Sequence, residues 1–137
     1  MKPKTRYNIK LAERRGVTVR KIGIDRIDIW YDLYLETAAR NRIYLHDIEY
    51  FKTVLEVNEK LHASSPKISM LIAEKDGIPL AAMFLATSLN RATYLYGASS
   101  SFNRNLMGTY ALQWEAIQIA KNEGCTEYDM FGVAPGP

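Results

Sequence analysis

Residues 94–133 read YLYGASSSFNRNLMGTYALQWEAIQIAKNEGCTEYDMFGV, and this stretch decides the fold that we expect for the chain. Its middle part, residues 106–123, has apolar side chains at the spacing of one helix face, and Gly124 supplies a C-terminal cap signal just beyond it. Extended segments precede and follow this helix, so the stretch predicts the order strand, helix, strand. The apolar positions of the helix are Met107, Tyr110, Ala111, Trp114, Ile117 and Ala120.

Three extended segments separated by short turns lead into that helix. The dipeptides Asp76-Gly77 and Asn90-Arg91 stand between them, and both are of the kind that occupies tight turns. Strands joined by such turns lie side by side and run in opposite directions, so we expect an antiparallel meander. Its three segments are KISMLIAEK (67–75), IPLAAMFLATS (78–88) and ATYLYGASS (92–100).

The chain opens with a basic helix and a strand. Residues 5–15 combine a few apolar positions with Lys and Arg, and Gly16 is a C-terminal cap signal for this helix. The next segment, VTVRKIG (17–23), alternates apolar and polar residues, as a strand with one solvent-facing side does.

Two further helices are expected before the meander. Asp25 or Asp28 can cap the first of them, which keeps helical apolar spacing until it ends near Asn41. The second begins at Asp47, and Ser-Ser-Pro at residues 64–66 stops it.

After the leading helix, the order is therefore strand, two helices, three antiparallel strands, helix and strand. This order resembles that of the GNAT acyltransferase fold, in which the fourth and fifth strands splay apart to admit an acyl donor. The resemblance implies an α/β (α+β) chain with a mixed, mostly antiparallel sheet flanked by helices. Because one fold can serve many functions, the function has to be argued from the site.

Length and composition exclude several classes of protein. The 137 residues suit a single domain over residues 1–137, with residues 1–16 leading into it, and 47% hydrophobic with 24% charged residues is typical of globular chains. The lone Cys125 excludes a disulfide scaffold. No apolar run follows the basic start, so we expect no signal peptide, no stable membrane insertion and a cytoplasmic location that can include the inner face of the membrane.

Charge is spread unevenly along the chain. Residues 1–26 contain nine Lys or Arg and only Glu13 and Asp25 as acids, a net charge of +7, whereas the remainder carries −4. Such a chain can present one basic face to a polyanion. The alternative is a basic helix that is simply solvated.

The connection at residues 97–110 bears on coenzyme A, which GNAT enzymes hold at a glycine-rich turn before the central helix. Gly97 and Gly108 are too far apart in sequence to form one compact phosphate-binding turn. Polar side chains of the connection can still bind an anion, namely those of Ser99, Ser100, Ser101, Asn103 and Arg104.

Three stretches resemble the second GNAT-like domain of the FemABX aminoacyltransferases, which build peptidoglycan interpeptide bridges. They are TRYNIKLAERRGV (5–17), YLETAARNRIYLHDIEYF (34–51) and, above all, residues 94–133. The resemblance implies an enzyme that moves an amino acid from aminoacyl-tRNA to a side-chain amine of a peptidoglycan precursor, either UDP-linked or lipid-linked. It implies no cofactor beyond aminoacyl-tRNA as co-substrate.

The same resemblance suggests which residues bind the precursor. It points to Arg40 and Tyr44, and to a tyrosine in the third meander strand, where period-two spacing puts Tyr94 and Tyr96 on one face. We favour Tyr96 because Gly97 follows it at the mouth of the strand. The rival interpretation is that such tyrosines pack in the core and that Arg40 pairs with the helix dipole.

This resemblance implies that the basic helix binds RNA. Basic side chains along the helix would attract the RNA phosphates, and this attraction weakens with salt and does not depend on the RNA sequence. The residues expected to bind RNA are Lys4, Arg6, Lys10, Arg14 and Arg15.

No catalytic base emerges from the sequence. Glu115 and Asp129 are the carboxylates expected nearest the cleft, but neither has a partner that the sequence reveals. His46 and His62 lack companions at metal-ligand spacing, so no zinc site is expected. Cys125 is interpreted as a buried apolar residue at the start of a strand.

The chain departs from the family in its extent. Relatives of this kind continue past the Gly-Val pair into a segment with a Phe-Lys pair, and they carry a companion GNAT-like domain that contributes a lysine. We therefore expect an isolated half, with activity of its own in doubt. Two other functions stay open: a coenzyme A-dependent N-acyltransferase, and a non-catalytic domain that binds RNA or a partner.

Overall fold

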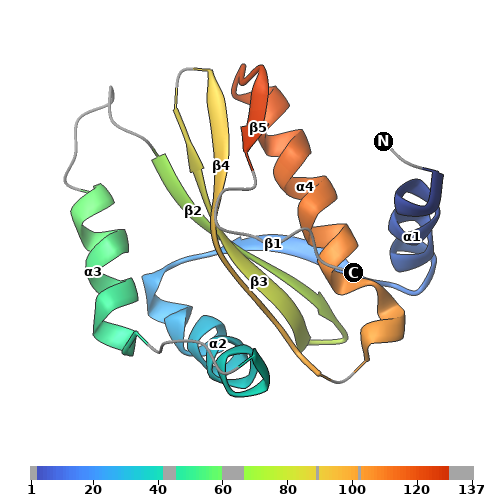
Figure 1. The fold of residues 1–137 in the computed structure, drawn as a ribbon, viewed down its shortest axis with the longest axis horizontal. Helices are drawn as coiled ribbons and strands as arrows, with labels where there is room; N and C mark the ends of the chain where they lie inside the picture. Colours follow the sequence, from blue (N-terminus) through green and yellow to red (C-terminus); the bar gives the residue numbers. More distant parts are fainter. Residues whose placement is uncertain (1–2, 42–45, 60–66, 89, 102, 130–137) are drawn as a thin grey trace.

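The computed structural model describes residues 3–41, 46–59, 67–88, 90–101 and 103–129. Within these residues the strands form one five-stranded sheet in the order β1-β2-β3-β4-β5 (Figure 1). The first four strands are antiparallel neighbours, whereas the fifth runs parallel to the fourth. The predicted meander and mostly antiparallel sheet are thus confirmed. The strands are β1 (Thr18–Ile22), β2 (Lys67–Lys75), β3 (Ile78–Thr87), β4 (Arg91–Ser99) and β5 (Glu127–Asp129).

Helices cover both faces of this sheet (Figure 1). α1 (Pro3–Arg14) and α4 (Gly108–Asn122) pack on one face, while α2 (Ile27–Asn41) and α3 (Ile48–Glu59) pack on the other. In the part of the chain that the structure describes, short 3-10 helices precede α2 and α4: η1 (Ile24–Arg26) and η2 (Arg104–Leu106).

The central strand β3 is buried on both faces, which divides the core into two layers. Met83 and Leu85 belong to the layer under α1 and α4, and Ala82 and Phe84 belong to the layer under α2 and α3. Trp30 of α2 is fully buried, with its ring centroid 4.8 Å from that of Phe84. Burying each large apolar side chain contributes about 1.5–3 kcal/mol, so these layers hold the helices on the sheet.

The two turns of the meander differ. Asp76 and Gly77 both have positive φ, 51° and 77°, as a two-residue turn of type I′ requires, so the first turn is confirmed. The second turn lies one residue earlier than expected, because Arg91 already belongs to β4 and exchanges backbone hydrogen bonds with Ser88.

The starts of α2 and α4 differ from the sequence-based expectations. Neither Asp25 nor Asp28 caps the turn before α2, where Gly23 occupies the cap position without a side-chain bond. α4 begins at Gly108 rather than at residue 106, because the backbone of Met107 is left-handed, with φ of 61°. A Cβ on Gly108 would lie 2.8 Å from the Cβ of Leu80, so glycine lets α4 start close against β3.

β4 and β5 pair over a short length at one end. The register joins only Arg91, Ala92 and Thr93 of β4 to residues 127–129 of β5. From Tyr94 onward, β4 has no strand partner on that side among the described residues, as expected for two strands that splay. Residues 130–133 of the predicted last strand lie outside the described residues, and Cys125 precedes β5, partly exposed rather than buried.

Candidate functional site

A β-bulge in β4 places Tyr94 and Tyr96 on opposite faces of the sheet. Phe84 of β3 pairs with Tyr96, but the next residue, Leu85, pairs with Tyr94, so one extra residue of β4 stands between them. Tyr94 joins the core layer under α4, whereas Tyr96 packs on the layer under α2 and α3. The expectation that they share a face is therefore wrong, because the bulge breaks the period of two.

Tyr94 fills the space above Gly97 on the α4 side. A Cβ built on Gly97 would lie 1.3 Å from the Tyr94 hydroxyl oxygen, so the ring occupies the volume that any other residue at position 97 would need. Burial raises the pKa of Tyr94 to about 12. Tyr94 is thus a core residue, as the rival interpretation held.

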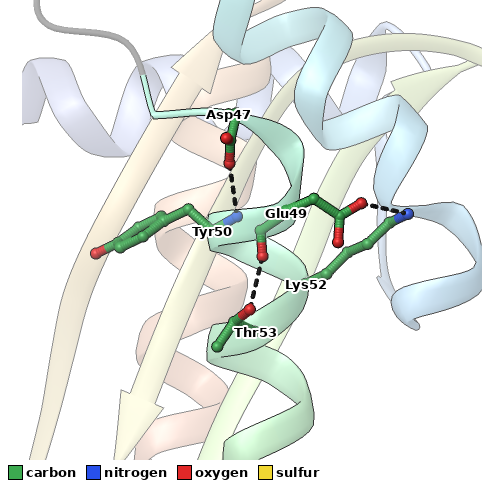
Figure 2. A network of polar contacts seen from close by, with 5 residues as sticks. All are labelled: Asp47, Glu49, Tyr50, Lys52 and Thr53. Atoms are coloured by element: carbon green, nitrogen blue, oxygen red, sulfur yellow. Dashed lines mark hydrogen bonds and ion pairs between the residues drawn. The ribbon is translucent and has the colours of Figure 1, made fainter.

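Tyr96 reaches the start of α3. Its hydroxyl is hydrogen-bonded to the hydroxyl of Tyr50, and the two rings meet edge to face with centroids 6.0 Å apart. Figure 2 shows how α3 presents Tyr50: the Asp47 side chain accepts a hydrogen bond of 3.0 Å from the Tyr50 backbone N–H, and the Tyr50 ring points away from the helix. The sequence predicts that this helix begins at Asp47; α3 begins one residue later, at Ile48, and the Asp47 side chain caps it and helps to fix the partner of Tyr96.

Contacts with α2 tie this end of α3 in place. The backbone N–H of His46 donates to the Tyr34 hydroxyl at 2.9 Å, and the Tyr31 hydroxyl donates to the His46 carbonyl at 3.1 Å. The His46 ring stacks on Tyr50, with centroids 4.0 Å apart. His46 therefore supports the phenol pair through stacking.

The phenol of Tyr96 stays protonated well above neutral pH. Partial burial raises its pKa to about 12, and the hydrogen bond with Tyr50 and the nearby Tyr50 and Tyr34 phenols act in the same direction. A neutral phenol is a hydrogen-bond donor and acceptor. Only one of the two hydroxyl protons can lie between Tyr50 and Tyr96, so the other is available to a ligand.

The C-terminal end of α2 is hydrogen-bonded to the C-terminal end of β4. Arg40 donates from Nη1 to the Ser99 carbonyl (3.2 Å) and to the Ser101 hydroxyl (2.9 Å), and from Nη2 to the Ser99 hydroxyl (2.9 Å). Thr37 Oγ1 accepts from the Ser99 backbone N–H at 2.8 Å. Its single proton is within reach of two carbonyls, that of Leu33 at 2.9 Å and that of Ser99 at 3.1 Å. The Glu36 carboxylate accepts from the Ser101 N–H at 2.7 Å. The guanidinium has five N–H donors, so about two remain for another acceptor.

We call this contact the α2–β4 seam, formed by Tyr34, Thr37 and Arg40 of α2 against Tyr96, Ser99 and Ser101. It brings two of the four expected precursor-binding residues, Arg40 and Tyr96, to the same face of the sheet. Tyr44 lies outside the described residues. Arg104 is exposed in η2, where its backbone carbonyl accepts from the Met107 N–H at 3.1 Å, and its side chain forms no hydrogen bond or ion pair within the described ranges.

Two cavities lie elsewhere. One of about 200 Å³ is lined by residues of β1, η1, α3 and β2, including Lys21, Leu55 and Ser69. One of about 90 Å³ lies between α1, β1 and α4, and Glu115 lines it together with Glu13 and Trp114. Glu115 thus belongs to the opposite side of the sheet from Tyr96, which corrects its expected place beside the cleft. The side chain of Asp129 is not among those described.

Comparison with known proteins gives the family. The model of the FemAB family matches residues 1–63 and 58–136, nearly the whole chain. The chain belongs to the FemAB family. Two relatives are lipid II:glycine glycyltransferase of Staphylococcus epidermidis, 22% identical over 98% of this chain, and the aminoacyltransferase FemA of Staphylococcus aureus, 32% identical over 57% of it. The matched regions make up 46% of the glycyltransferase and 20% of FemA. This FemAB chain therefore spans about half the length of the glycyltransferase.

Solved structures agree on the fold. The crystal structure of FemX superposes with a TM-score of 0.86 at 18% identity, over 99% of this chain and 49% of FemX. A ribosomal-protein-alanine N-acetyltransferase from Brucella melitensis superposes with a TM-score of 0.64 at 12% identity, over 88% of this chain and 83% of its own. The GNAT-like fold expected from the element order is confirmed.

The basic residues of α1 divide into two groups. Lys4, Arg6, Lys10 and Arg14 are exposed. Arg15, just beyond the helix, is partly buried and donates from Nη1 to the carbonyl of Asn105 in η2, so it joins α1 to the connection between β4 and α4.

The described ranges hold neither a metal-binding cluster nor a membrane-spanning helix. There, no three His, Cys, Asp or Glu side chains gather closely enough to hold a metal ion. Nor does any described helix combine the length and apolar character needed to cross a membrane.

Sequence reasoning missed Tyr50, Glu36 and Thr37. Thr37 carries a signal, because it is a polar residue on the apolar stripe of α2 that contains Trp30 and Leu33. A buried hydroxyl in such a position needs a hydrogen-bond partner, which Ser99 supplies. No comparable signal marks Tyr50, whose role depends on the fold bringing α3 beside β4.

Proposed function

We propose that this chain is the precursor-binding half of a FemAB-type aminoacyltransferase. The reaction would move an amino acid from aminoacyl-tRNA to a side-chain amine of a peptidoglycan precursor. The FemAB match over nearly the whole chain carries the proposal. The activities for which two relatives are named, glycyl transfer to lipid II and aminoacyl transfer by FemA, support it.

The α2–β4 seam supplies the chemistry that such an acceptor needs. A peptidoglycan precursor carries phosphates and carboxylates, and the donors of Arg40 that Ser99 and Ser101 leave unused suit an oxyanion. The protonated Tyr96 hydroxyl can complete the contact. Both groups are held by neighbours before a ligand arrives, which lowers the ordering cost of binding.

The chemical step places modest demands on the protein. An aminoacyl ester is already activated, so the acceptor amine has to lose a proton and attack the ester carbonyl. The amide bond then forms as the ester C–O bond breaks and the 3′-terminal hydroxyl of the tRNA leaves. Holding the two reactants together can supply several kcal/mol of the barrier. In this proposal the seam orients the acceptor, and no residue of the chain is assigned as the base.

Calorimetric titration with a UDP-linked muropeptide tests the proposal. Arg40→Lys loses the planar fork and Tyr96→Phe loses one hydroxyl, so each is expected to weaken binding about tenfold, the effect of about 1.4 kcal/mol. Tyr94→Phe, which removes a hydroxyl from the same strand on the opposite face, is the matched control and is expected to bind like the wild type.

Two results contradict the proposal. One is wild-type affinity in both Arg40→Lys and Tyr96→Phe. The other is tight binding of acetyl-CoA without any response to the muropeptide, which would favour a coenzyme A-dependent N-acyltransferase.

A further inference from the structure

We infer that the exposed face of α1 is a docking surface for RNA, in which a tyrosine ring stacks on a base and a row of cations meets the phosphates. The inference rests on the proposed function only in taking that RNA to be the aminoacyl-tRNA donor. The surface itself is argued from the side chains of α1.

The row of cations follows from helix geometry. Arg6, Lys10 and Arg14 are four residues apart in turn, so they lie along one side of the helix over about 12 Å. All three are exposed. The buried face of α1 is a different one, made by Asn8, Ile9 and Ala12.

An exposed aromatic ring lies within the same row. Tyr7 is 59% exposed, and the Arg14 guanidinium lies over its ring, 5.9 Å from the centroid. At this exposure much of the Tyr7 ring is open to a ligand. Proteins that bind single-stranded nucleic acid combine a basic track with such rings, on which bases stack.

The charges in the first turn of α1 are unfavourable for helix stability. This turn contains no acidic residue, while Lys4 and Arg6 stand at the end of the helix where the dipole is positive. Each such cation is unfavourable by a few tenths of a kcal/mol or more. A departure from a local rule of this kind is expected where a residue serves binding.

The surface leads toward the proposed acceptor site. α1 packs beside α4 (Figure 1), and Arg15 at its end binds the Asn105 carbonyl in η2, next to the exposed Arg104. η2 follows the segment that Arg40 holds at Ser99 and Ser101. An RNA lying along α1 would therefore direct one end toward the connection between β4 and α4.

A membrane surface fits α1 less well than RNA does. A helix that lies in a membrane interface buries an apolar face among the lipids. Of the apolar side chains of α1, Ile9 and Ala12 are buried in the protein and Leu11 is partly buried. Most of the exposed residues of α1 are charged, and Tyr7 adds an exposed aromatic ring.

The test measures binding of an RNA hairpin with a single-stranded 3′ end, built as a tRNA acceptor stem, to the 137-residue chain over a series of salt concentrations. Tyr7→Ala is expected to weaken binding about tenfold with little change in the salt dependence, because a stacked base carries no counterion. Tyr7→Phe keeps the ring and is expected to bind like the wild type.

Lys10→Gln is expected to lower the slope of log K against log salt by about one, the effect of one lost phosphate contact. Lys52→Gln, which removes one cation from α3 on the opposite side of the sheet, is the matched control and should keep the wild-type slope. Circular dichroism of each variant verifies that the fold is retained.

Three results would overturn the inference. The first is equal RNA affinity of Tyr7→Ala and the wild type, and the second is an equal slope change in Lys10→Gln and Lys52→Gln. The third is that phosphatidylglycerol vesicles bind the chain with the same dependence on Tyr7. Muropeptide binding by the wild-type chain reports on the proposed function separately, so the failure of one claim is distinguishable from the failure of the other.

Discussion

Tyr94 and Tyr96 show how much a single extra residue changes. They stand two apart in β4, yet the bulge turns Tyr94 into the core under α4 and Tyr96 toward Tyr50 and the α2–β4 seam. Tyr94 packs above Gly97, where its hydroxyl has little access to solvent. Tyr96 shares a hydrogen bond with Tyr50, and this phenol pair keeps one hydroxyl proton that a ligand can use. The same residue type therefore has a structural role at one position and a proposed binding role at the other.

The burial of Tyr94 predicts a loss of stability in alkali. Its pKa is about 12 in the folded chain and about 10 when unfolded, so its stabilising contribution is complete below pH 10 and is lost as the pH rises through 12. At pH 11 the loss from this one residue is about 1.4 kcal/mol. Urea unfolding of the wild type and of Tyr94→Phe at pH 8 and pH 11 measures it.

The wild type is expected to lose that much more stability than Tyr94→Phe between the two pH values. Deprotonation of lysines and of Cys125 affects both proteins alike and cancels in the comparison. Parallel losses in the two proteins would mean that the Tyr94 phenol is not protected.

At the level of elements, the contact between α2 and β4 depends on polar atoms as well as on apolar packing. At the end of β4, on the side away from β3, Thr37 accepts from the Ser99 N–H, and Arg40 donates to the Ser99 carbonyl. Arg40 and Glu36 continue this contact to Ser101. The seam thus closes the edge of the sheet and at the same time arranges the donors of the proposed site.

Thr37→Val is expected to destabilise the chain by about 1–3 kcal/mol, because the Ser99 N–H is left without its acceptor. The matched control is Thr53→Val on α3. The Thr53 hydroxyl donates to the Glu49 carbonyl at 2.8 Å (Figure 2). Thr53 is exposed, so water can replace it in this hydrogen bond. Denaturant unfolding should show little change for Thr53→Val, and equal losses in the two variants would contradict the role given to Thr37.

The helices, strands and turns were more predictable from the sequence than the contacts between them. The order of helices and strands, the Asp76-Gly77 turn and the start of α3 next to Asp47 follow from local patterns of apolar spacing, turn chemistry and capping. The bulge in β4, the left-handed Met107 that delays α4 and the contact of Arg15 with Asn105 depend on residues far apart in sequence. Local periodicity contains no information about them.

At the scale of the whole molecule, the two sides of the sheet carry different proposed tasks. The side of α2 and α3 holds the seam with Arg40 and Tyr96, and the side of α1 and α4 carries the basic row of α1. The Arg15 contact with η2 links the two through the connection between β4 and α4. This FemAB chain spans about half the length of the glycyltransferase that it matches, and the transfer reaction is a proposal.

The most direct test of the central claim is a map of amide chemical shifts of the isotope-labelled chain during titration with a UDP-linked muropeptide. The account predicts that the amides of Arg40, Tyr96, Ser99 and Ser101 respond together and saturate with one affinity. A spectrum unchanged at millimolar muropeptide, or a response confined to the cavity lined by Lys21 and Leu55, would contradict it.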